Sequence, residues 1–136
     1  MTLGPLARVE LACRDPRRQR EFYARILGLS PSVPVAVPAG PATIPASPPS
    51  FALGGVELVL RPRGDALFPQ VREPPCDAGT LLAFPVTDAE LDRWHRRMMT
   101  ARIAVLEAPG AGGAPPRLLR VADPEGNVIE LFSASE

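Results

Sequence analysis

Two glutamates in similar apolar settings are the residues of this sequence with the clearest chemical potential. Glu57 lies in FALGGVELVL (51–60), and Glu130 lies in DPEGNVIELF (123–132). A carboxylate placed among apolar residues needs a cation or hydrogen-bond donors, because an isolated charge removed from water is very costly. Such a group can bind a metal, act as a general base, or pair with an arginine. The simplest alternative is a polar residue on the solvent side of a strand.

Few other residues suggest catalysis. His95, the single histidine, lies within a predicted helix that begins near Asp88. Cys13 and Cys76 fit neither a disulfide framework nor a zinc pattern, and isolated cysteines are usually small core residues. The sequence contains no Ser-His-Asp set and no phosphate-binding glycine loop.

The composition limits the partners of the chain. Its 136 residues carry 15 basic and 15 acidic side chains, so no net field attracts nucleic acid or an anionic membrane. Arginine clusters at 16–20 and 93–98 are interpreted as solvated helix faces. No apolar stretch approaches the roughly 20 residues that a bilayer span needs, and no secretory signal pattern begins the chain. We therefore expect a cytoplasmic protein that contacts neither nucleic acid nor membrane.

An internal repeat organises the sequence. RVELACRD (8–15) aligns with LLAFPVTD (81–88) at an offset of 73 residues, and the same offset brings Val56-Glu57-Leu58 onto Ile129-Glu130-Leu131. Two separate matches at one offset predict a tandem duplication. The predicted modules span about 5–63 and about 78–134 within one domain covering 1–136.

Each copy begins with a strand and continues into a helix. Asp15 is the predicted N-cap of the first helix, with Pro16 at its first position and Gly28 at its end. Asp88 is the predicted cap of the second helix, in which the apolar residues Leu91, Trp94 and Met98 recur at helical spacing.

Strands and turns fill the remainder of each copy. The proline-rich segment 31–50 leaves room for one short edge strand near 33–37; the rest is either an irregular connection or a lid over a pocket. A hairpin with Gly54-Gly55 at its turn follows. The second copy has strands near 103–106, 117–122 and 128–132, the last two joined by a type I turn that begins at Asp123.

The predicted fold class is α+β, with two tandem βαβββ modules. Each module has its helix on one face of its sheet, so the other face must meet something else. We expect the sheets to form a cup with the helices on the outer face.

These motifs resemble those of the vicinal oxygen chelate superfamily, which includes glyoxalases, bleomycin-resistance proteins and extradiol dioxygenases. The resemblance rests on the paired modules, on DPRRQREFYARILGL (15–29) and on the terminal DPEGNVIELF, and it covers essentially the whole chain. It implies a cup-shaped sheet, a homodimer and, in metal-dependent members, four ligands on strands. Those ligands are typically a histidine on the first strand of each copy and a glutamate on the last strand.

Strand alternation defines the residues that would face the cup. Val9, Leu11 and Cys13 of the first strand are expected to face the helix, as are Leu82, Phe84 and Val86 in the repeat. The candidate ligand-binding residues on the other face are Arg8, Glu10, Glu57, Val59, Leu81, Ala83, Glu130 and Phe132.

The chain departs from the metal-binding pattern at both first-strand positions. They hold Arg8 and Leu81, and neither side chain has a lone pair to donate to a metal. We therefore expect no metal and no cofactor, and we hypothesise that Arg8 pairs with Glu130 or Glu57 in place of an ion. In the alternative, both glutamates lie at a solvated rim and Arg8 makes only a surface ion pair.

Three functions follow from these expectations. The first is a metal-free small-molecule-binding protein, of the kind that sequesters antibiotics. The second is a metal-dependent lyase, isomerase or dioxygenase, which Arg8 and Leu81 argue against. The third is a metal-free enzyme in which Glu57 or Glu130 acts as the general base.

Overall fold

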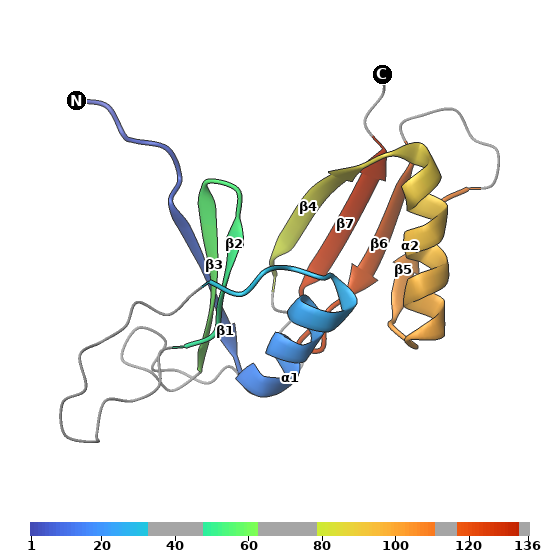
Figure 1. The fold of residues 1–136 in the computed structure, drawn as a ribbon, viewed down its shortest axis with the longest axis horizontal. Coiled ribbons are helices and arrows are strands. Elements are labelled where there is room, and N and C mark those ends of the chain that lie inside the picture. The colour runs from blue at the N-terminus through green and yellow to red at the C-terminus, as the bar shows by residue number, and fades with distance from the viewer. Residues whose placement is uncertain (33–47, 63–78, 111–116, 134–136) are drawn as a thin grey trace. The chain divides into compact units, whose positions relative to one another are not determined.

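The computed structural model describes residues 1–32, 48–62, 79–110 and 117–133 (Figure 1). The chain divides into two compact units, Met1–Val71 and Arg72–Glu136, each with its own sheet and helix. The α+β class and the repeat of strand, helix and further strands are confirmed. No helix in the described ranges is both long enough and apolar enough to cross a bilayer.

The sheet of the first unit has three strands in the order β1-β3-β2. β1 (Arg8–Cys13) runs parallel to β3 (Val56–Pro62), and β2 (Ser50–Leu53) runs antiparallel to β3. The predicted hairpin is present, since Leu53 and Val56 pair on either side of the two glycines. Gly54 has φ +59°, a conformation that side-chain-bearing residues adopt at a steric cost.

The first helix changes geometry part-way along. α1 (Pro16–Glu21) has Asp15 as its N-cap, as predicted, with the Asp15 carboxylate accepting from the Arg18 N–H at 3.1 Å. A π-helical turn, η1 (Phe22–Ile26), follows, and its wider hydrogen bond joins the Leu27 N–H to the Phe22 carbonyl at 3.1 Å.

This turn directs aromatic side chains into the core of the first unit. Phe22 and Tyr23 are buried and meet edge to face, with ring centroids 5.2 Å apart. Tyr23 also lies 6.1 Å from the ring of buried Phe51 on β2. Aromatic contacts thus link the end of the helix to the sheet.

The sheet of the second unit has four strands in the order β4-β7-β6-β5 (Figure 1). β4 (Leu81–Val86) is parallel to β7 (Val128–Ser133), β7 is antiparallel to β6 (Leu118–Ala122), and β6 is antiparallel to β5 (Val105–Glu107). The helix α2 (Asp88–Thr100) packs on β6 and β7. Its buried side chains Leu91 and Met98 belong to the predicted apolar stripe.

The predicted cap of the second helix was wrong by one residue. Thr87, not Asp88, is the N-cap, because its hydroxyl accepts from the Glu90 N–H while the Glu90 carboxylate accepts from the Thr87 N–H at 3.0 Å. Asp88 instead accepts from the Arg117 guanidinium at 2.9 Å. Arg117 is only 8% exposed and also contacts Asp92, so it ties the start of β6 to the helix.

The loop between β6 and β7 is organised by one buried carboxylate. The Gly126 N–H donates to the Asp123 carbonyl at 3.1 Å, as the predicted four-residue turn requires. The Asp123 carboxylate also accepts from the backbone N–H groups of Glu125 and Asn127, both at 2.9 Å, and from the Asn127 side-chain amide at 2.7 Å. This closed set of bonds fixes where β6 ends and β7 begins.

The two ladders of the repeat differ in register by two residues. Arg8 is opposite Glu57 in the first unit, whereas Glu130 is opposite Ala83 in the second, and Leu81 is opposite Val128. If the register of the first unit applied to the second at the offset of 73, Leu81 would be opposite Glu130. Because strand side chains alternate with a period of two, this shift leaves every residue on its predicted face.

Some sequence predictions lie outside the described residues. They are the edge strand at 33–37, most of the proline-rich segment, and Cys76. Cys13 is described and is fully buried beside Leu11, in agreement with a core role.

We predict that Asp123→Ala lowers the free energy of unfolding by at least about 2 kcal/mol, because buried donors of Asn127 and Glu125 lose their acceptor. Asp123→Asn is the matched control, since its carbonyl oxygen can still accept from both backbone N–H groups. Urea unfolding at neutral pH measures both variants. Equal losses in the two would contradict this account of the loop.

The capping box of α2 predicts a pH effect. Hydrogen bonds from Thr87 lower the pKa of Glu90 below 4.5, so the folded state favours the charged carboxylate. The stabilisation is complete above pH 4.5 and is lost as the pH falls through the lowered pKa. We expect Glu90→Gln, which retains an acceptor, to reduce the loss of stability on acidification. Denaturant unfolding at pH values above and below 4.5 tests this, and an unchanged pH dependence would refute it.

Candidate functional site

The face of the second sheet that points away from α2 is arranged in three cross-strand rows. The middle row crosses all four strands, because Glu107 is opposite Arg120, Arg120 opposite Glu130, and Glu130 opposite Ala83. The opposite face carries buried Leu119, Val121, Ile129 and Leu131. The helix and the core therefore lie on one side, and the charged row lies on the other.

Three alternating charges form the middle row. The Arg120 guanidinium donates to Glu130 at 2.9 Å and to Glu107 at 2.8 Å. Its hydrogen bond to Glu130 raises the pKa of Arg120, so the guanidinium stays charged at any physiological pH. Glu130 is 17% exposed and Glu107 is 52% exposed, which makes Glu130 the partner more shielded from water.

Apolar residues border this row on both sides. One flanking row is Leu118, Phe132 and Pro85, and the other is Ala122, Val128 and Leu81. Leu81 is 49% exposed and contributes apolar surface to this face. The face thus combines apolar contact area with a fixed line of hydrogen-bonding groups.

The corresponding face of the first sheet carries a different charge pair. Glu10 on β1 accepts from the Nε of Arg61 on β3 at 3.1 Å, and the two side chains are 17% and 21% exposed. Arg8 approaches the same Glu10 oxygen at 3.8 Å but is 62% exposed. Arg61 is therefore the main partner of Glu10.

The hypothesis that Arg8 is the counter-charge of Glu130 or Glu57 needs correction. Glu130 is paired with Arg120, and within the described residues the ion pair of Arg8 is with Glu10. Glu57 is exposed, although it lies opposite Arg8 in the ladder. On these sheet faces a guanidinium does pair with each shielded glutamate, Glu10 and Glu130. It belongs to Arg61 on β3 or to Arg120 on β6, and not to a residue of β1.

Arg61, Arg120 and Glu107 are the charged residues of these faces that the sequence prediction missed. A signal for Arg120 was present, because a hairpin centred on Glu125 places residues equally distant from it opposite each other. Arg120 and Glu130 are both five positions from Glu125. The predicted face residues Val59, Ala83 and Phe132 do share their faces with the charge pairs.

The donor groups of either unit do not suit a transition metal. Within the described part of each unit, no three His, Cys, Asp or Glu side chains gather into a possible metal site. Glu10 and Glu130 already accept from guanidinium groups, which would have to be displaced. The first-strand positions supply Arg8 and Leu81, which cannot coordinate.

A sequence profile of the Glyoxalase/Bleomycin resistance protein/Dioxygenase superfamily matches residues 5–131. The chain belongs to this superfamily. A search of curated proteins found no match for this superfamily member.

Solved structures of the same fold resemble this superfamily member. A glyoxalase/bleomycin resistance protein/dioxygenase from Nocardioides is 20% identical with a TM-score of 0.73, over 100% of this chain and 87% of the other. Lactoylglutathione lyase from Agrobacterium tumefaciens is 19% identical (TM-score 0.68; 98% and 96% covered). The fosfomycin resistance protein FosX from Mesorhizobium loti is 14% identical (TM-score 0.67; 99% and 95% covered). At these identities the likeness shows the fold alone.

The charged row predicts unequal couplings. In double-mutant cycles with Arg120→Met, Glu130→Gln should show a favourable coupling free energy, because this pair is more shielded from water. Glu107→Gln should show a coupling near zero, since exposed ion pairs contribute little. Urea unfolding of the single and double variants measures both values. A larger coupling for Glu107 would contradict the assignment of Glu130 as the main partner.

Proposed function

We propose that this protein is a metal-free small-molecule-binding protein of the glyoxalase/bleomycin-resistance kind. The observation that carries the proposal is the pairing of Arg120 with Glu130 at 2.9 Å, between two apolar rows of the same sheet face. One of the two carboxylates comparable with a superfamily metal ligand, Glu130, is thus neutralised by the protein's own cation. The chain keeps the superfamily fold, and in it Glu130 fixes the orientation of the Arg120 guanidinium.

The face favours an uncharged or amphipathic ligand. Burying apolar surface against Phe132, Leu118 and Leu81 contributes roughly 25 cal/mol per Å² removed from water. The guanidinium and carboxylates of the middle row would orient polar groups of the ligand, and they are already fixed by their mutual bonds. A strongly charged ligand would gain less, because the row largely neutralises itself.

Sequestration of an antibiotic is the form of binding that we favour. Binding without turnover needs no metal and no free base, and the shielded carboxylates of both sheets are held by arginines. The likeness to FosX, whose name describes a fosfomycin resistance protein, is consistent with this proposal at the level of the fold. We also propose a homodimer, on the basis of the superfamily resemblance.

A metal-free enzyme is the second candidate, and Glu57 is the residue that favours it. Its carboxylate is exposed and makes no ion pair within the described residues, unlike Glu10 and Glu130. A general base must be free to accept a proton from a substrate. Glu57→Gln would abolish turnover in such an enzyme but would leave simple sequestration unchanged.

Native mass spectrometry of protein purified without chelator tests the proposal. We expect no stoichiometric metal, subunits in pairs, and an organic molecule retained by the folded protein. One equivalent of zinc, nickel, iron or manganese per subunit would instead support the metal-dependent lyase, isomerase or dioxygenase. Turnover of the retained molecule would support the metal-free enzyme.

Variants of the second sheet sharpen this test. Arg120→Gln and Phe132→Ala should each lower the fraction of protein that carries the retained molecule. Arg96→Gln, an exposed position on α2, is the matched control for loss of one guanidinium and should have no effect. Circular dichroism confirms that each variant is folded. Full retention by both sheet variants would place the ligand elsewhere.

A further inference from the structure

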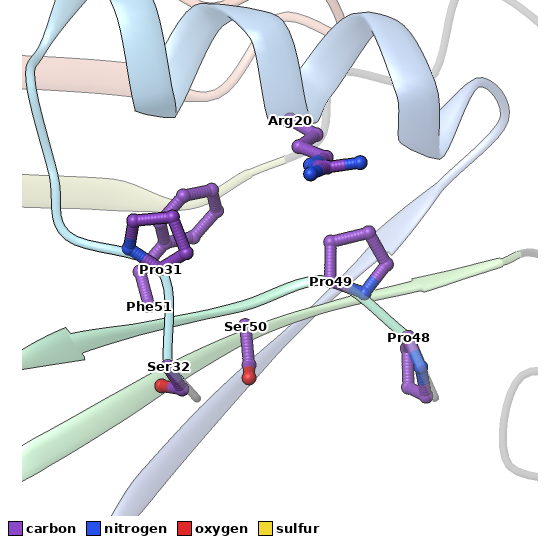
Figure 2. Close-up of a pocket in the computed structure, with 7 residues that line it drawn as sticks. All are labelled: Arg20, Pro31, Ser32, Pro48, Pro49, Ser50 and Phe51. Atoms are coloured by element: carbon purple, nitrogen blue, oxygen red, sulfur yellow. The ribbon is translucent and has the colours of Figure 1, made fainter. Parts of the chain in front are cut away.

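A separate cavity lies in the first unit, between α1 and the start of β2. Its volume is about 260 Å³. Its lining consists of Arg20, Pro31, Ser32, Pro48, Pro49, Ser50 and Phe51 (Figure 2). None of these residues belongs to the ion pairs of the sheet faces.

The cavity has one charged group set among apolar rings. Figure 2 shows the guanidinium of Arg20 reaching from α1 into the space between the rings of Pro31, Pro49 and Phe51. Ser32 and Ser50 turn their hydroxyl groups the other way, as expected for neighbouring positions along an extended chain. The polar side chain that a ligand would meet is therefore the guanidinium.

Arg20 is available to a ligand. It forms no ion pair with any residue that the structure describes, whereas Arg25 on the following turn is paired with Glu21 at 2.9 Å. A guanidinium presents parallel N–H donors that match a carboxylate with two hydrogen bonds. The proline nitrogens carry no hydrogen and add no competing donor.

The floor of the cavity is fixed by backbone hydrogen bonds. Pro31 and Phe51 form an antiparallel bridge, with the Ser32 N–H donating to the Ser50 carbonyl at 2.8 Å and the Ala52 N–H donating to the Ser30 carbonyl at 3.2 Å. Phe51 is 1% exposed and contacts Tyr23 of η1. The rings are thus held in place before any ligand arrives, which reduces the entropic cost of binding.

We propose that this cavity binds a small organic carboxylate with a planar apolar body. The carboxylate pairs with Arg20, and the body packs on the rings of Pro31 and Pro49, while the buried ring of Phe51 supports the floor of the cavity. An inorganic anion would leave these apolar rings unused, and an uncharged molecule would leave the guanidinium unpaired. The volume is below the roughly 300 Å³ at which drug-sized pockets begin, so the ligand is a small molecule with a single ring.

The experiment is a titration of the full chain with sodium benzoate, followed by two-dimensional amide NMR. We expect saturable shifts at Ser32, Ser50 and Phe51, weakened about tenfold or more by Arg20→Gln, which corresponds to losing a charge-assisted pair. Arg17→Gln is the matched control, since Arg17 is an exposed arginine of the same helix that does not line the cavity. Benzamide, which lacks the charge, should bind more weakly than benzoate.

Several results would overturn the proposal. They are the absence of saturable shifts, equal effects of the Arg17 and Arg20 variants, shifts confined to the second unit, and phosphate binding as tightly as benzoate. Arg20→Lys, which retains the charge but loses the paired donors, should give intermediate affinity and serves if Arg20→Gln fails to fold. The sheet-face proposal is independent, because its variants Arg120→Gln and Phe132→Ala should not change benzoate binding.

Discussion

The candidate site depends on the register of the hairpin formed by β6 and β7. Asp123 sets this register, because its carboxylate accepts from three donors in the loop and so fixes the point at which the chain reverses. Five residues to either side, Arg120 and Glu130 come directly opposite each other. A slip of one residue would move Glu130 to the helix side of the sheet and leave its charge in the core. The chemistry of the face is thus a consequence of a buried turn.

Arginine is well suited to the place that a metal would otherwise take. A divalent ion holds carboxylates through short bonds and leaves open coordination positions for a substrate. A guanidinium neutralises the same carboxylates through directed hydrogen bonds but offers no Lewis acidity. The second sheet shows this arrangement at Glu130, which Arg120 holds, whereas in the first sheet Arg61 holds Glu10 and the last-strand carboxylate Glu57 is exposed. On the second sheet the result is a polar surface ordered by its own ion pairs.

The sequence predicted the fold well because its signals were local or periodic. The two-residue alternation of the strands, the glycine hairpin and the Asp123 turn each depend on neighbouring residues, and each was confirmed. The predicted N-cap of α2 was wrong because Thr87 and Asp88 are both good capping residues. The carboxylate of Asp88 accepts from Arg117, which is distant in the sequence, and so the local sequence could not decide between them. The partner of Glu130 was missed for a related reason. An ion pair depends on which strands are neighbours, and the neighbour of Glu130 across the hairpin is Arg120, not Arg8.

The difference in ladder register between the two units limits how far their positions are interchangeable. A shift of two residues moves a side chain about 6.6 Å along its strand without changing the face on which it lies. Positions that align in the sequence repeat therefore have different cross-strand neighbours in the two units. Placing histidines at positions 8 and 81 would not recreate the same surroundings in both halves.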